Sequence, residues 1–116
     1  MSGVSEDDAA DEWLEELVGS WVEVYKKSAT SLVLLRIIDA IGPAPAAEIG
    51  AELARRTGWD LTERGLYRTL RRLASSGLLA TVDVPVPRTG AQRKDFTVTD
   101  FGHRYLAQIE AVARLA

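Results

Sequence analysis

The sequence has no cysteine and only one histidine, His103. The absence of cysteine excludes disulfides and zinc sites built from thiolates, and one histidine is too few for a histidine-rich metal site. A serine-type triad is not expected either, because Ser75 and Ser76 stand beside arginines where a helix should end, not at a nucleophile elbow. A glycine-rich phosphate loop is missing as well. We therefore expect no metal, no other cofactor and no enzymatic activity.

Long apolar runs are also absent. No stretch approaches the roughly 20 apolar residues that span a membrane. The N-terminus starts acidic and lacks the basic and then apolar pattern of a signal peptide. We expect a soluble, cytoplasmic protein with no membrane partner. Its 116 residues suffice for one compact domain but not clearly for two.

Acidic and basic residues are unevenly distributed along the chain. The first 24 residues contain eight acids and no base, although the whole chain has a net charge of only −3. All 14 basic residues lie in the remainder, which carries a charge of +5. Binding of a charged partner depends on the local electric field at the contact surface, not on the net charge of the whole chain. The basic remainder of the chain therefore indicates a nucleic-acid partner. Charge alone leaves one alternative open, namely ordinary solvation of an acidic helix and of surface arginines.

A basic amphipathic helix is predicted over Thr62–Ser76. Thr62 is a good N-cap because its hydroxyl oxygen can accept a hydrogen bond from an unpaired backbone N–H. Gly77 can adopt the left-handed conformation that ends a helix. One apolar stripe is formed by Leu66, Leu70 and Leu73, with Tyr67 beside it, and the other faces carry Arg64, Arg68, Arg71 and Arg72. We interpret this segment as a recognition helix for a groove of DNA.

Two further helices are predicted before the recognition helix. Leu32–Ile41 is apolar almost all round, which favours a buried helix, although its β-branched residues leave a strand open. The proline-rich segment Gly42–Pro45 ends it. Ala46–Thr57 is the second helix, and the turn Gly58–Asp60 joins it to the recognition helix. Two short helices joined by a tight turn that contains glycine, the second of them basic, are typical of a helix-turn-helix.

A β-hairpin is predicted after the recognition helix. Its strands are Leu79–Val84 and Lys94–Val98, and the loop Pro85–Arg93 between them is not expected to be regular. A hairpin in this position is the wing of a winged helix, which contacts the sugar-phosphate backbone or the adjacent minor groove. A solvated basic loop is the alternative. The basic residues of the wing are Arg88, Arg93 and Lys94.

The N-terminal part combines acids with aromatic residues. Residues 1–10 are small, polar and acidic, and we expect a disordered tail there. An amphipathic helix is predicted over Asp11–Lys27, followed by a polar break at Ser28–Ser31. Its apolar stripe has three alternatives: it packs on its own domain, it forms a dimer interface, or it holds a flat aromatic ligand. The stripe contains Trp13, Leu17, Trp21 and Tyr25.

A last helix is predicted over Thr99–Leu115. Thr99 or Asp100 can cap it, and Gly102 near its start allows close approach of another segment. Since this helix lies outside the three-helix core, its apolar stripe needs a partner, and the first helix is the obvious one, within one chain or across a two-fold axis. The stripe contains Tyr105, Leu106, Ile109 and Val112.

The stretches GLYRTLRRLASSGLL and RKDFTVTDFGHRYL resemble the PadR family of winged-helix transcriptional regulators over about Leu32–Ile109. Thr-x-x-Gly, which opens the last helix, also occurs in the similar MarR family. After Gly42-Pro43 the family typically has His-Gly-Tyr, whereas this chain has Ala44–Ala47. The matching positions are Gly65, Leu66, Tyr67, Leu70, Leu73, Gly77, Leu78, Leu79, Phe96, Thr99 and Gly102. The resemblance implies a homodimeric DNA-binding repressor, often responsive to small aromatic compounds.

The expected fold is mainly α with a small β-hairpin (α+β). It is a single domain of residues 11–116, with a winged helix-turn-helix over residues 32–98 and additional dimerisation helices over residues 11–27 and 99–115. The expected function is that of a dimeric DNA-binding transcriptional regulator, with a winged-helix adaptor that binds protein as the alternative. We expect double-stranded DNA to contact Thr62, Arg64, Tyr67, Arg68, Arg71 and the three basic wing residues. A second copy would pack on the two aromatic stripes, and an aromatic effector would bind near Trp13 or Trp21.

Overall fold

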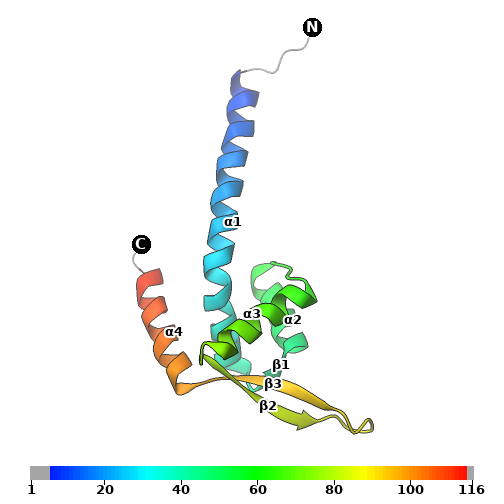
Figure 1. The fold of residues 1–116 in the computed structure, drawn as a ribbon. Helices are drawn as coiled ribbons and strands as arrows, with labels where there is room; N and C mark the ends of the chain where they lie inside the picture. The colour runs from blue at the N-terminus through cyan, green and yellow to red at the C-terminus, as the bar shows by residue number, and fades with distance from the viewer. Residues whose placement is uncertain (1–5, 115–116) are drawn as a thin grey trace. The chain divides into compact units, whose positions relative to one another are not determined.

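The computed structural model describes residues 6–114. Over these residues it contains four α-helices and three β-strands, so the protein is mainly helical with a small sheet, as the sequence predicted (Figure 1). The chain forms two compact units, one that ends at Thr30 and one that begins at Ser31. Within residues 6–114, no helix is both long enough and apolar enough to cross a membrane.

Helix α1 spans Glu6–Ile41 and is longer than the sequence suggested. It begins with three acids, which favour a helix N-terminus, so the expected tail is helical from Glu6 onward. Residues 1–5 of that tail lie outside the described part. The break expected at Ser28–Ser31 is wrong, because the helix continues through it. The Thr30 hydroxyl donates a hydrogen bond to the carbonyl oxygen of Lys26 one turn earlier, so a polar side chain is satisfied inside the helix.

The second unit contains the end of α1 and three shorter helices. These are α2 (Ala46–Thr57), α3 (Glu63–Ser75) and α4 (Asp100–Ala113). The glycine helix end predicted at Gly77 after α3 is confirmed by its positive φ of 84°, and Gly58, predicted as part of the turn, ends α2 in the same way with a φ of 72°. Leu115, where the last helix was expected to end, lies outside the described residues.

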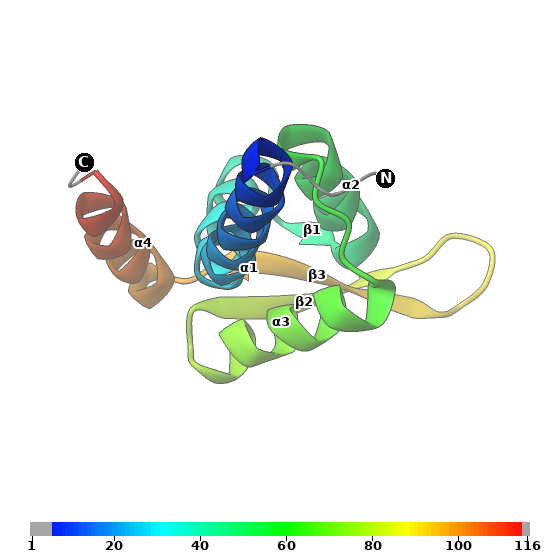
Figure 2. The same ribbon diagram turned by 90° about the horizontal axis from the view of Figure 1, so that it is seen from above.

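The sheet is antiparallel and has the strand order β1-β3-β2. The predicted hairpin is formed by β2 (Leu79–Pro85) and β3 (Gln92–Val98), and Pro85 still pairs with Gln92 at its far end. In both Figure 1 and Figure 2 the hairpin extends beyond α2 and α3. The short strand β1 (Ala44–Pro45) was not predicted. Its proline suggested only a turn, but an edge strand tolerates proline because it pairs on one side only.

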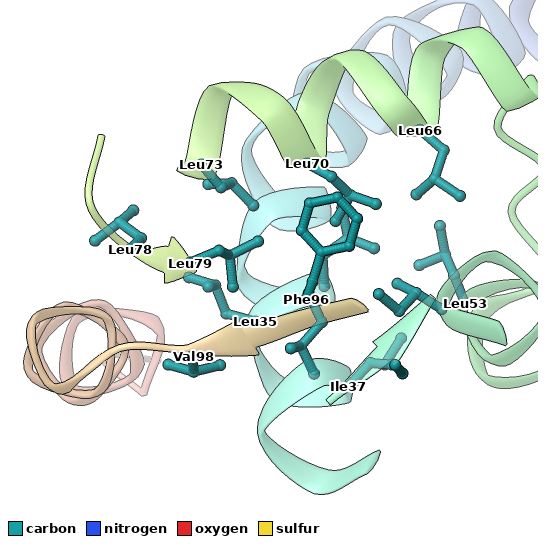
Figure 3. Close-up of a cluster of buried hydrophobic side chains, with 14 of the residues drawn as sticks. Leu35, Ile37, Leu53, Leu66, Leu70, Leu73, Leu78, Leu79, Phe96 and Val98 are labelled. Atoms are coloured by element: carbon teal, nitrogen blue, oxygen red, sulfur yellow. The ribbon is translucent and has the colours of Figure 1, made fainter. Parts of the chain in front are cut away.

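The hydrophobic core of the second unit lies between α3, the sheet and the end of α1. Figure 3 shows the leucines of α3 pointing into the core, with Leu70 beside Phe96 on β3. Leu70 and Phe96 are 0% and 1% exposed, and Trp59 packs against the same core. The predicted stripe Leu66, Leu70 and Leu73 is therefore the buried face of α3. Burying that face fixes which side of α3 remains exposed.

The start of α4 is hydrogen-bonded to the segment that follows α3. The Thr99 hydroxyl accepts a hydrogen bond from the backbone N–H of Gly102 (2.9 Å) and donates one to the carbonyl oxygen of Gly77 (2.6 Å). A β-carbon at Gly102 would lie 2.1 Å from the carbonyl oxygen of Leu78, so only glycine fits there. The close approach expected at Gly102 is therefore present, and it sets where α4 leaves the sheet.

Candidate nucleic-acid interface

The exposed face of α3 is basic. Arg64 and Arg68 are both exposed, and within residues 6–114 neither forms an ion pair. An open hollow of about 550 Å³ runs along this face. Its lining consists of Arg64, Tyr67, Arg68, Arg71, Arg72 and Ser75. Guanidinium groups without acidic partners leave their N–H donors available to phosphate oxygens or to base edges.

Thr62 performs the capping role that the sequence predicted. Its side-chain oxygen accepts a hydrogen bond from the backbone N–H of Gly65 at 3.0 Å. That bond uses a lone pair of the hydroxyl and leaves its hydrogen free to be donated. Thr62 can therefore cap α3 and still donate to a ligand at the exposed N-terminal end of the helix.

Tyr67 and Arg71 form one assembly on α3. The Tyr67 ring stands edge-on to Phe96, with ring centroids 6.4 Å apart and planes at 82°. The Arg71 guanidinium lies 5.9 Å from the Tyr67 ring centroid, within range of a cation–π interaction. Tyr67 thus connects the core to the surface and restrains Arg71, which was expected only to reach out to phosphates.

The three basic residues of the wing have different surroundings. Arg93 forms an ion pair at 3.0 Å with Asp95, whose side chain is only 7% exposed, so this arginine neutralises a nearly buried carboxylate. Lys94 lies 3.7 Å from the exposed Asp83 on the paired strand. Arg88 is exposed near the tip and has a positive φ of 77°. The wing therefore offers one restrained cation and two more accessible ones.

A second, smaller hollow of about 230 Å³ joins α3 to the hairpin. Two of its polar side chains, Ser75 and Thr81, were not among the predicted interface residues. Ser75 was interpreted only as part of a helix end. The helical spacing of Tyr67, Arg71 and Ser75 could have revealed Ser75, because residues four apart share a face. Nothing local marks Thr81, since its position beside α3 depends on how the strand packs.

The arginines of α2 are engaged within their own helix. The Glu52 carboxylate accepts hydrogen bonds from Arg55 and from Arg56, and these bonds lower the pKa of Glu52 from 4.5 to about 2. The same carboxylate raises the pKa of Arg55. The positive charges of α2 are therefore largely compensated, in contrast to those of Arg64 and Arg68 on α3.

The aromatic stripe of α1 is exposed to solvent in the single chain. Trp13 and Trp21 are 59% and 65% exposed, and Leu17 is about half exposed. The rings of Trp21 and Tyr25 are stacked, with centroids 5.1 Å apart and planes at 10°. A stacked pair of this size presents a large apolar area, which is uncommon on a monomeric protein.

The stripe of α4 is only partly available, which corrects the expectation for Leu106. Tyr105 and Val112 are exposed, but Leu106 is 5% exposed and belongs to the core of the second unit, and Ile109 packs against that core. The reason is that α4 returns onto the end of α1, where Arg36 pairs with Glu110 at 2.9 Å. The prediction had placed the whole stripe outside the core.

A comparison with protein families finds a match over most of the chain. The model of the family described as transcriptional regulator PadR-like matches residues 34–108. This range includes the last part of α1, the helix-turn-helix, the wing and most of α4. A search of curated proteins gave no significant match.

Solved structures give similar folds. One is a PadR family transcriptional regulator from Eggerthella lenta DSM 2243, with 27% identity and a TM-score of 0.76 over 90% of this chain and 88% of that chain. A PadR family transcription regulator from Clostridium difficile R20291 has 22% identity and a TM-score of 0.63, over 74% and 88%. A PadR-like transcriptional regulator from Bacillus cereus strain ATCC 14579 has 21% identity and a TM-score of 0.65, over 75% and 82%. The last two likenesses concern the fold alone.

Proposed function

The chain belongs to the transcriptional regulator PadR-like family, and we propose that it is a homodimeric repressor that recognises a specific DNA sequence with α3 and the wing. DNA binding and transcription regulation follow from the family. The dimer, the repression and the residue roles are the finer part of the proposal. A cytoplasmic location belongs to it too, since the regulator must reach its DNA.

One observation carries the proposal. Helix α3 buries its leucines and exposes arginines that have no acidic partner among the described residues. We assign Arg64, Tyr67 and Arg68 to the major groove, because the guanidinium fork can meet the two acceptors of a guanine edge. Thr62 and Arg71 would contact backbone phosphates. The wing residues Arg88, Arg93 and Lys94 would follow the backbone beside that groove.

Specific regulation requires more than one recognition helix, since a single helix contacts too few bases. Two-fold pairing would place two copies of α3 in successive major-groove faces about 34 Å apart. The exposed aromatic stripe of α1 and, separately, Tyr105 and Val112 on α4 would each offer apolar surface for that pairing. A small aromatic effector would then bind near Trp13 or Trp21, where stacking surfaces are exposed.

The proposal is tested by selecting bound fragments from genomic DNA and measuring their affinity in gel shifts at several salt concentrations. A steep loss of affinity with salt is expected, because binding to phosphates releases counterions. Arg68→Ala should weaken operator binding by about 1–3 kcal/mol if this side chain reads a base edge. Arg104→Ala is the matched control, since it removes the same charge from an exposed position on α4. Absence of binding at every salt concentration would instead favour an adaptor that binds protein.

A further inference from the structure

The hollow between α3 and the hairpin shares one wall with the arginine-lined hollow. Tyr67, Arg71 and Ser75 line both, so these residues form a ridge along α3 with one hollow on each side. On the far side of the ridge the chemistry changes. There the lining is completed by Ala74 of α3 and by Thr81, Lys94 and Phe96 of the strands.

The polar groups around this second hollow can all donate hydrogen bonds. Arg71 and Lys94 bring two positive charges from different elements, and Ser75 and Thr81 each bring a hydroxyl. No carboxylate lines the hollow; the exposed Asp83 outside its lining lies 3.7 Å from Lys94, and a phosphate would compete with this surface ion pair. A phosphodiester carries a single negative charge on two free oxygens, which suits cations and hydroxyls that converge on one small volume. The volume of about 230 Å³ admits a phosphate group.

The floor of the hollow holds these groups in place. Phe96 is buried beneath it, and Tyr67 packs edge-on against Phe96. Because Arg71 lies 5.9 Å from the Tyr67 ring centroid, its guanidinium is restrained at the rim before any ligand arrives. Lys94 and Thr81 project from paired strands, whose ladder fixes their separation. The Arg71 guanidinium and the backbone positions of Thr81 and Lys94 are therefore set before a ligand binds, which reduces the entropy lost on binding.

We propose that this hollow binds one DNA backbone phosphate, held jointly by Arg71 of α3 and Lys94 of the wing with the hydroxyls of Ser75 and Thr81. The inference rests on the proposed function and adds to it a shared contact that couples the recognition helix to the hairpin. Because the helix enters the groove and the wing follows the backbone, a strand of DNA passes between them at this position. The phosphate there fixes the register of α3 and reads no sequence itself.

The first test locates the phosphate directly. Operator duplexes are prepared in which one phosphate at a time is replaced by a neutral methylphosphonate, and their affinity for the wild-type protein is measured. The same series is repeated with Arg71→Gln and with Lys94→Gln. For both variants, neutralising one and the same phosphate should no longer reduce the affinity. For Arg88→Gln, which is altered outside the hollow, this should hold at a different phosphate. All three side chains are exposed, so the variants should fold, and circular dichroism checks this.

The second test uses salt dependence. A plot of log affinity against log salt falls with a negative slope. Removal of both Arg71 and Lys94 should make this slope less steep by about 0.9 if the two side chains contact one phosphate, and by about 1.8 if they contact two separate phosphates. Each single substitution should weaken binding about tenfold, and the double variant should lose less than the product of the two losses. Thr81→Val and Ser75→Ala should weaken binding several-fold without changing the slope, since they remove no charge.

The outcomes separate the two proposals. If the wild-type protein binds no genomic fragment, the proposed function fails and this inference fails with it. If the wild type binds but Arg71→Gln and Lys94→Gln respond to different phosphates, or if their losses multiply fully, only the shared phosphate is refuted. A common phosphate together with the smaller slope change supports it.

Discussion

Helix α3 and the first part of α1 use their apolar residues in opposite ways. In α3 the apolar stripe is covered by the chain itself, as the 0% exposure of Leu70 shows, and the basic face remains for a ligand. In α1 the residues before Ser31 include two tryptophans that are 59% and 65% exposed. An amphipathic helix is therefore not enough to assign a role. What matters is which of its faces the same chain covers.

This difference suits the two helices to different partners, α3 to a charged ligand and α1 to another apolar surface. Where the chain covers the apolar face, the remaining face is charged and suits a charged partner such as DNA. Where the apolar face stays uncovered, burying it on a second molecule is favourable by roughly 25 cal/mol per Å². The four predictions below test that division in order of decreasing expected effect.

Leu70→Ala should lower the free energy of unfolding by about 2–5 kcal/mol, because it leaves a cavity in a fully packed core. The loss should not depend on protein concentration. Leu17→Ala is the counterpart in α1, and in a homodimer its loss should vary with protein concentration, since association and folding are linked. Urea denaturation at several protein concentrations measures both. Identical behaviour of the two variants would remove the contrast between the helices.

Trp21→Glu combined with Val112→Glu should give a folded monomer that has lost most operator affinity, by about a hundredfold, because two recognition helices no longer act together. Both side chains are 65% exposed, so the charges should not disturb the core. Sedimentation reports the oligomeric state, circular dichroism the fold and gel shifts the affinity. A dimer that survives the double substitution would place the interface elsewhere.

Gly102→Ala should lower the free energy of unfolding by about 1–3 kcal/mol, because the new β-carbon would collide with the Leu78 carbonyl. Gly19→Ala is a matched control in α1, where a β-carbon meets nothing within 4 Å. That variant should be neutral or more stable by up to about 1 kcal/mol, from helix propensity alone. Thermal unfolding of the two variants compares the packed region with the open one, and equal losses would contradict the difference in packing.

Glu52→Gln tests the ion pairs that compensate the arginines of α2, unlike the unpaired arginines of α3, and the effect on stability should be small because the arginines are exposed to solvent. The pKa of Glu52 falls from 4.5 to about 2 in the folded protein, so its contribution is fully present above about pH 4.5. It is lost as the pH falls from there through about 2. Stability curves of wild type and variant should therefore converge in acid. Arg55→Gln with Arg56→Gln should remove the same pH dependence, and a difference of undiminished size at pH 2 would exclude the mechanism.

Helix α3 could be predicted because its signals are local. Thr62 caps it, leucines at helical spacing mark its buried face, and Gly77 with its positive φ follows its end. The hairpin was also predictable from two strands around a loop rich in turn residues. Expectations failed where a partner distant in sequence decides. The strand at Ala44–Pro45 exists only because β3 lies beside it, and Leu106 is buried because α4 packs in the core of its unit.

The sequence by itself thus determined the helix-turn-helix with its wing and the family to which the chain belongs. These depend on periodicity, caps and turns, which act over a few residues. The tertiary structure decided which cations remain available. It tied Arg93 to the buried Asp95, restrained Arg71 over Tyr67, and brought Ser75 and Thr81 to a common hollow with Lys94. The physical reason is that ion pairs and hollows join residues from different elements, and their spacing is set by the packing of the core.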